Sequence, residues 1–130
     1  MDCYRLDLLA DTYIFETADG RVTVNMGAPI LDLPKVPFKA DALKHTLVNG
    51  CEVWQLPLKA ANTESEAHVA VVSMGNPHAV QVVDDVENAP VLSEGPIIEN
   101  HPRFPRRVNV GFMQVQSRSH IKLRVWERSA

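Results

Sequence analysis

Residues 45–56 read HTLVNGCEVWQL, and this stretch decides the fold class. The dipeptide Asn49-Gly50 lies between two runs that are rich in β-branched and aromatic residues. Asn-Gly favours the tight turn of a two-residue hairpin, because both residues tolerate positive φ angles. The stretch therefore predicts two antiparallel strands, over residues 45–48 and 51–56.

Short strands are predicted on both sides of this hairpin, from apolar alternation, apolar runs and turn signals such as Asp19-Gly20. In the last of them, Ile121, Leu123 and Val125 face one way, and Lys122, Arg124 and Trp126 face the other. That alternation is typical of a half-buried sheet. The other predicted strands are residues 12–16, 21–26, 69–74, 79–83 and 108–116.

Two segments between these strands are predicted to be loops. Residues 27–37 contain three prolines and predict an extended loop, because proline lacks the donor that a strand ladder needs. Residues 60–66 are polar and predict a second loop.

Residues 84–101 are the helical candidate. Asn88 can cap a helix there, and Pro90 suits its first turn. Gly95-Pro96 is predicted to split the segment into two short helical turns. The fold class is therefore α+β, a mainly antiparallel sheet of short strands with one short helical segment. So small a segment covers little of the sheet's apolar face, and we expect a partner chain or a helix from outside this sequence to pack there.

Composition excludes several classes of protein. The chain has 130 residues, which corresponds to one domain, and its 45% hydrophobic and 22% charged residues are ordinary for a globular domain. The formal net charge is −3, so there is no basic excess to neutralise phosphates. We therefore expect neither a nucleic-acid partner nor a membrane partner.

The sequence favours a cytoplasmic location. No export signal pattern is found near residue 1, and the longest run without Asp, Glu, Lys or Arg, residues 67–83, is shorter than the about 20 residues that a spanning helix needs. Cys3 and Cys51 are expected to be reduced thiols. They form no zinc-binding pattern, so no metal site is predicted.

Three places in the sequence combine polar side chains with the ends of predicted strands. In residues 73–78, SMGNPH, Asn76 either makes the turn or binds a ligand, and His78 could tune a nearby acid or base. Asn109 lies within an apolar strand and makes either one structural hydrogen bond or a ligand contact. Glu127-Arg128 follows the last strand and is either solvated surface or a carboxylate-binding arginine beside an orienting glutamate.

Together these stretches resemble the diaminopimelate epimerase family, over about residues 16–130. The resemblance implies a cofactor-independent, pyridoxal-phosphate-independent isomerase of lysine biosynthesis that interconverts LL- and meso-2,6-diaminopimelate by a two-thiol proton transfer. The matching stretches are VNMGAP (24–29), VSMGNPHAV (72–80), DDV (84–86), GP (95–96), HPRFP (101–105), NVGFMQV (109–115) and RVWER (124–128).

The resemblance also implies roles for individual residues. Asn76, Asn109 and Arg128 match residues that hold the non-reacting end of the substrate, as amides and a guanidinium can grip a carboxylate. His78 and Glu127 match the groups that partner the two catalytic thiols. The small-molecule substrate would be diaminopimelate, the cofactor none, the metal none, and the assembly a homodimer.

The sequence also departs from the family pattern. The family's catalytic cysteines lie in Cys-Gly-Asn-Gly and Ala-Cys-Gly-Ser/Thr-Gly segments, neither of which occurs here, and Ser129 stands where the family usually has Gly. We therefore expect residues 16–130 to form most of the second lobe without its central helix, preceded by a poorly matched segment 1–15. This chain by itself is expected to be inactive.

Two other interpretations remain open. The chain could be a non-catalytic fold fragment or interaction module that self-associates through its exposed sheet face. It could also resemble a related isomerase of the same fold that acts on proline-like or aromatic substrates. Arg128 together with Asn76 and Asn109 favours a second carboxylate, and hence diaminopimelate.

Overall fold

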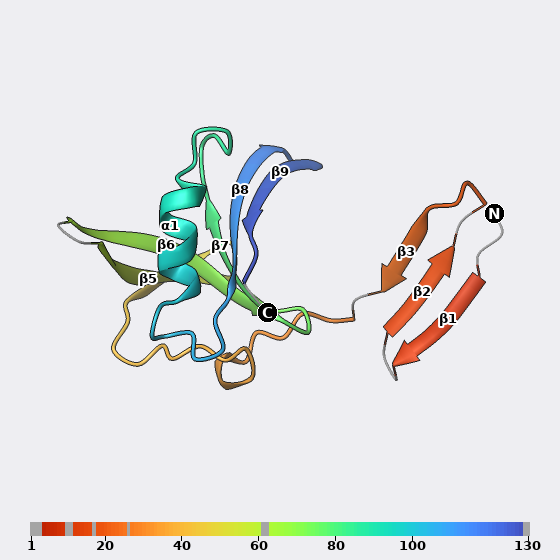
Figure 1. Ribbon diagram of the computed structural model, residues 1–130, viewed down its shortest axis with the longest axis horizontal. Helices are drawn as coiled ribbons and strands as arrows, with labels where there is room; N and C mark the ends of the chain where they lie inside the picture. The colour runs from red at the N-terminus through yellow and green to blue at the C-terminus, as the bar shows by residue number, and fades with distance from the viewer. Residues whose placement is uncertain (1–3, 10–11, 17, 26, 61–62, 129–130) are drawn as a thin grey trace.

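The computed structural model describes residues 4–9, 12–16, 18–25, 27–60 and 63–128, which form two sheets (Figure 1). Strands β1 (Tyr4–Leu9), β2 (Thr12–Glu16) and β3 (Val22–Asn25) make a three-stranded antiparallel sheet. Among the described residues these strands contact only one another, and Figure 1 shows them apart from the other sheet. The expected division between residues 15 and 16 stays a prediction.

The larger sheet has six strands in the order β4-β5-β6-β7-β8-β9. Neighbouring strands are antiparallel except for β7 and β8, which are parallel and are connected through helix α1 (Val91–Glu99). This arrangement confirms the α+β class with a mainly antiparallel sheet. The strands are β4 (His45–Val48), β5 (Cys51–Ala60), β6 (Thr63–Ser73), β7 (Pro77–Val82), β8 (Asn109–Ser117) and β9 (His120–Trp126).

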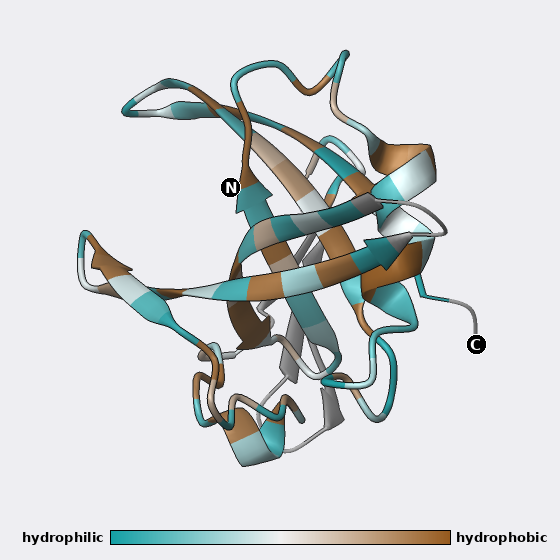
Figure 2. Ribbon diagram, turned by 90° about the vertical axis from the view of Figure 1, so that its left-hand side faces the viewer, coloured by the Kyte–Doolittle hydropathy of each residue, from teal (hydrophilic) through white to brown (hydrophobic). Residues whose placement is uncertain are grey.

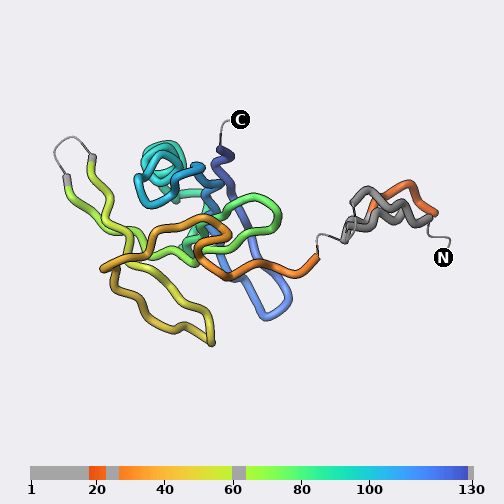
Figure 3. The backbone as a smooth tube through the Cα atoms, turned by 90° about the horizontal axis from the view of Figure 1, so that it is seen from below, coloured from red at the N-terminus to blue at the C-terminus, as the bar shows by residue number. Residues whose placement is uncertain are grey.

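The Asn49-Gly50 hairpin is confirmed. Asn49 has φ 51° and Gly50 has φ 82°, and Val48 pairs with Cys51. Two successive positive φ angles are the feature that Asn-Gly tolerates and that a hairpin turn of this type requires. Figure 3 shows the β4–β5 hairpin (yellow) and the β8–β9 hairpin (blue) both extending from the body of the molecule toward the bottom of the view.

The loop predicted over residues 60–66 is wrong, because β5 and β6 continue as paired strands to Ala60 and Thr63. Lys59 lies opposite Glu64, so opposite charges face each other across the hairpin. Pairing between the two strands satisfies the backbone there, while the polar side chains remain exposed to water. A polar composition therefore indicated exposure rather than a loop.

The predicted split of the helical segment is also wrong, since α1 is one helix with Pro96 inside it. Proline removes one backbone donor, but the buried Gly95 and Ile98 pack the helix against the sheet. Asn88 does not cap this helix: the N-cap residue is Pro90, and the Asn88 amide donates to Asp85 Oδ2 at 2.6 Å. α1 is the one α-helix among the described residues, and with nine residues it is too short to cross a lipid bilayer.

The predicted loop over residues 27–37 contains one short 3₁₀ turn, η1 (Leu33–Lys35), and otherwise forms no regular element. Its Ile30 makes an isolated bridge with Ser73 at the end of β6. The loop therefore passes over the point where β6 ends.

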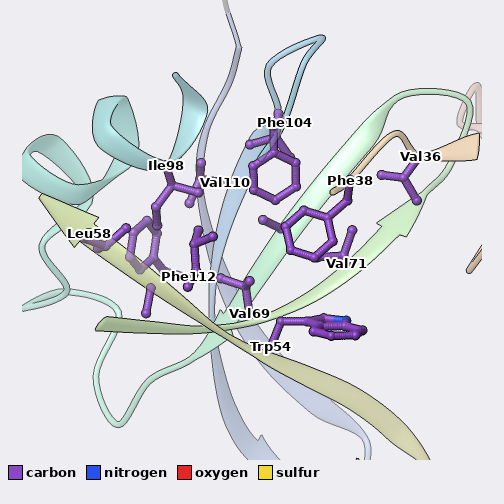
Figure 4. Packing of buried hydrophobic residues seen from close by; sticks show 14 of the residues in the cluster. Val36, Phe38, Trp54, Leu58, Val69, Val71, Ile98, Phe104, Val110 and Phe112 are labelled. Carbon is purple, nitrogen blue, oxygen red and sulfur yellow. The ribbon is translucent and has the colours of Figure 1, made fainter. Parts of the chain in front are cut away.

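The core lies on one face of the six-stranded sheet, beneath α1 and the loops around it (Figure 4). Phe112 lies beside Ile98 and Leu58, and Phe38 packs on Phe104 with ring centroids 4.7 Å apart. The strands contribute their side chains with the period of two that a sheet requires. The hydrophobic strand residues of this core are Trp54, Leu56, Leu58, Ala67, Val69, Val71, Ala79, Val110 and Phe112.

The opposite face of β7, β8 and β9 is apolar and uncovered among the described residues. Figure 2 shows hydrophobic and hydrophilic residues alternating along the strands. The alternation predicted for β9 is present, but α1 packs on the Trp126 side, and Ile121, Leu123 and Val125 are 53%, 52% and 43% exposed. We call Val82, Val115, Ile121, Leu123 and Val125 the uncovered face.

Candidate functional site

The turn between β6 and β7 places Asn76 and His78. Gly75 has φ 92°, a conformation that favours glycine, and its N–H donates to Ser73 Oγ at 3.3 Å. The Met74 N–H donates to the Asn76 carbonyl at 3.1 Å, which closes the turn. The side chains of Asn76 and His78 therefore project from a turn that is held by its own hydrogen bonds.

The strand register brings this turn close to Asn109 and to residues 127–128, the other two candidate places in the sequence. His78 pairs with Asn109 across the parallel strands β7 and β8, and Val110 pairs with Trp126 across β8 and β9. The beginning of β7, the beginning of β8 and the end of β9 consequently meet at one end of the sheet. Residues 73–78, Asn109 and residues 127–128 lie far apart in sequence but converge here.

The contact with Asn76 indicates which nitrogen of the His78 ring carries a proton. His78 Nε2 lies 3.0 Å from Asn76 Oδ1, and because that oxygen can only accept, Nε2 carries the proton and donates. Burial lowers the pKa of the His78 imidazole, and the nearby Arg128 guanidinium lowers this pKa further. The ring is therefore neutral at pH 7, and its Nδ1 is left as a proton acceptor.

Asn109 joins the two neighbouring segments. It is buried, its Nδ2 donates to the Pro77 carbonyl at 3.2 Å, and its Oδ1 accepts from the Arg128 N–H at 2.8 Å. The structural alternative for this residue is therefore observed, in the form of two hydrogen bonds. One Nδ2 hydrogen and one Oδ1 lone pair remain beyond these two bonds.

Arg128 completes the group. Its Nη1 donates to the Arg106 carbonyl at 3.1 Å, which uses one of the five N–H donors of the guanidinium. The side chain is half-buried, close enough to His78 to lower the pKa of that imidazole. The remaining donors form the planar fork that suits a carboxylate.

We call Asn76, His78, Asn109 and Arg128 the polar cluster. Glu127 is exposed, and within the described part of the chain no hydrogen bond or ion pair joins its carboxylate to these four residues. Cys51 is exposed on the β4–β5 hairpin, which β6 separates from β7, and Cys3 lies outside the described residues. Within the described ranges, no three His, Cys, Asp or Glu side chains gather as metal ligands would.

Sequence reasoning missed a buried charged group behind the polar cluster. Glu99, the last residue of α1, is 4% exposed and accepts from Trp126 Nε1 at 2.9 Å. Arg107 Nη1 lies 3.7 Å from the other carboxylate oxygen. The sequence signal was the placement of Glu99 four residues after Gly95, on the same helix face.

Known proteins match this chain over most of its length. The family model described as diaminopimelate epimerase matches residues 70–130, the range that holds the whole polar cluster. The chain is 57% identical over 110 residues to a diaminopimelate epimerase of Albidiferax ferrireducens, an alignment that covers 85% of this chain and 38% of that protein. The chain belongs to the diaminopimelate epimerase family.

Other diaminopimelate epimerases match to a similar degree. The protein of Variovorax paradoxus is 57% identical over 113 residues, which cover 87% of this chain and 38% of the relative. The protein of Acidovorax ebreus is 54% identical over 114 residues, covering 88% of this chain and 39% of the relative. The chain thus spans well under half the length of these curated diaminopimelate epimerases.

Proposed function

We propose that this chain carries the part of a diaminopimelate epimerase that binds the non-reacting end of 2,6-diaminopimelate. Asn76, Asn109 and Arg128 are the binding residues, and the observation that supports this role is their convergence at one end of the sheet with donors left over. A guanidinium fork and two amides suit a carboxylate beside an amine. His78 and Glu127 would partner the two thiols of the family's proton transfer.

The proposed reaction is the interconversion of LL- and meso-2,6-diaminopimelate. One thiolate removes the α-proton from one face of the carbon, and a thiol returns a proton to the other face, with neither pyridoxal phosphate nor a metal. The neutral His78 ring supports its part in this scheme, because Nδ1 can accept a hydrogen bond from a thiol. We further propose a cytoplasmic protein that works as a homodimer.

Replacing Arg128 by glutamine tests the binding role. Pentane-1,5-diamine carries two amines at the same spacing as 2,6-diaminopimelate but has no carboxylate. We expect the 130-residue chain to prefer 2,6-diaminopimelate over pentane-1,5-diamine by about 10- to 100-fold, the value of one or two charge-assisted hydrogen bonds. In R128Q most of this preference should be lost. The measurement is a titration followed by the NMR signals of the Asn76 and Asn109 side-chain amides.

Arg118→Gln is the matched control, because Arg118 is exposed in the β8–β9 turn. This variant should keep the wild-type preference. An unchanged preference in R128Q, or equal binding of the two compounds by the wild-type chain, would contradict the proposed role of Arg128. Binding is measured here rather than turnover, because the family's two cysteine segments do not occur in this sequence.

A second function, self-association, is favoured by the uncovered face. Its five residues carry no charge, so two identical copies can meet about a two-fold axis without repulsion. The occupant that we infer is a second copy of this chain. This interface would serve the chain as an interaction module, whatever its catalytic state.

Leu123→Lys is expected to dissociate this dimer. Each copy would bury one Leu123, so the substitution removes about 3 kcal/mol or more per dimer and raises the dissociation constant about a hundredfold. Sedimentation velocity measures the change. Leu92→Lys is the control, because Leu92 is 77% exposed on α1, which packs on the other face. A wild-type chain that sediments as a monomer at all concentrations would rule the interface out.

A further inference from the structure

Glu99 is a buried carboxylate in a place where the helix itself disfavours it. It ends α1, and the carbonyl groups at a helix C-terminus repel negative charge. Burial adds the cost of removing a charge from water. The side chain must therefore be held by partners, and two of them, Trp126 and Arg107, come from different segments of the chain.

The two partners immediately precede the polar cluster. Trp126 is two residues before Arg128, and Arg107 is two residues before Asn109. The Trp126 ring lies against Gly95, so that a Cβ atom on Gly95 would fall 2.6 Å from Trp126 Cγ. Gly95 and Glu99 thus hold the indole from the same helix face, one by contact with the ring and one by accepting its N–H.

The other partner lies at a bend of the backbone. Arg107 has φ 60°, a conformation that residues other than glycine rarely adopt. The same two segments bind each other in the cluster, where the Arg128 N–H donates to Asn109 Oδ1 and Arg128 Nη1 donates to the Arg106 carbonyl. One carboxylate therefore contacts both segments just behind the point where they bind each other.

Stability alone gives no reason for a charge at this position. Replacing a buried ion pair with apolar residues of similar volume is often neutral or stabilising. A carboxylate with two oxygens, however, can fix the relative placement of an indole N–H and a guanidinium, which an apolar side chain cannot do.

We propose that Glu99 is a positioning residue that holds the segments carrying Arg128 and Asn109 through Trp126 and Arg107. It rests on the proposed function only in treating Arg128 and Asn109 as substrate-binding residues. The geometry that it explains, the Arg128–Asn109 hydrogen bond, is a property of the chain without ligand.

The test measures hydrogen exchange of the Arg128 backbone amide by NMR, with the Asn109 side-chain amide as a second signal. Glu99→Leu is expected to speed exchange at Arg128 about tenfold, as the loss of one hydrogen bond of ordinary strength would. Trp126→Phe removes the indole N–H and should act in the same direction. Glu99→Gln keeps an oxygen for Trp126 Nε1 and should restore most of the protection.

Two controls separate positioning from general destabilisation. Glu94→Gln changes a carboxylate in the first turn of the same helix and should leave Arg128 unchanged. The Val53 amide in the β4–β5 hairpin reports the stability of a distant part of the sheet. The proposal is overturned if Glu99→Leu speeds exchange equally at Val53 and Arg128, or leaves Arg128 and Asn109 unchanged.

No ligand enters this experiment, so its outcome is independent of whether diaminopimelate binds. If Glu99→Leu does not fold, Trp126→Phe and Glu99→Gln still decide the question. The proposal then requires faster exchange at Arg128 in Trp126→Phe and near wild-type exchange in Glu99→Gln, and any other pair of results refutes it.

Discussion

Replacing Phe112 by alanine should lower the free energy of unfolding by about 3–5 kcal/mol. Phe112 is 1% exposed and lies in the middle of β8, where Ile98 of α1 and Leu58 of β5 pack beside it (Figure 4). Removing the ring opens a cavity. Because β8 is paired with β7 on one side and β9 on the other, it cannot move far enough to fill that cavity. Denaturant unfolding with a fitted m-value measures the change.

Val115→Ala on the same strand is the matched control. Val115 is 56% exposed on the uncovered face, so its substitution should cost less than about 1 kcal/mol. Similar losses for the two variants would show that the core does not lie on the α1 side of the sheet. A large loss in the free energy of unfolding for F112A alone would place the core on the α1 side of the sheet.

Gly95→Ala is expected to destabilise the protein, although alanine is the better helix former by about 0.5–1 kcal/mol. The added Cβ would lie 2.6, 2.8 and 2.9 Å from Cγ, Cβ and Cδ2 of Trp126. Two of these atoms are at the root of the side chain, so α1 and β9 must separate. Overpacking of this kind costs about 1–3 kcal/mol, which leaves a net loss of up to about 2.5 kcal/mol, centred on about 1 kcal/mol.

Gly111→Ala serves as the control for Gly95→Ala, because it makes the same substitution where space exists. The nearest atom to a Cβ at Gly111 is Val80 Cγ2 at 3.4 Å, an ordinary contact. The free energy of unfolding should then stay constant or rise by about 0.4–1 kcal/mol, since alanine reduces the entropy of the unfolded chain. A stabilised G95A variant would mean that the Trp126 ring does not lie on α1.

Local chemistry was enough to predict the β4–β5 hairpin. Asn49-Gly50 needs two positive φ angles, and this requirement is present in the two residues themselves. The β5–β6 extension was missed because exposed paired strands and loops have similar polar compositions. Pro96 inside α1 was missed because packing of Gly95 and Ile98 on the sheet outweighs the loss of one helical hydrogen bond.

The candidate site was predictable in its residues but not in its geometry. Asn76, Asn109 and Arg128 were identified through their resemblance to a family, and the register of β7, β8 and β9 brings them together. The Asn109 bonds to backbone groups could not be foreseen, because they depend on which strand lies beside β8. Glu99 was missed for the same reason: its partners come from segments that only the folded chain brings near α1.

The parallel pairing of β7 with β8 has a consequence for how the chain assembles. Every other neighbouring pair in the six-stranded sheet is joined by a short turn, whereas residues 83–108 connect β7 to β8, so β4–β7 and β8–β9 are two local units that can form early. Joining them requires closure of the long connection through α1, which makes this junction the slow, non-local event. Asn76 and His78 belong to the first unit, and Asn109 and Arg128 to the second. A ligand that contacts both pairs of residues would therefore bind only molecules in which the two units have docked. The fraction of molecules that bind it would then measure the fraction that is fully folded.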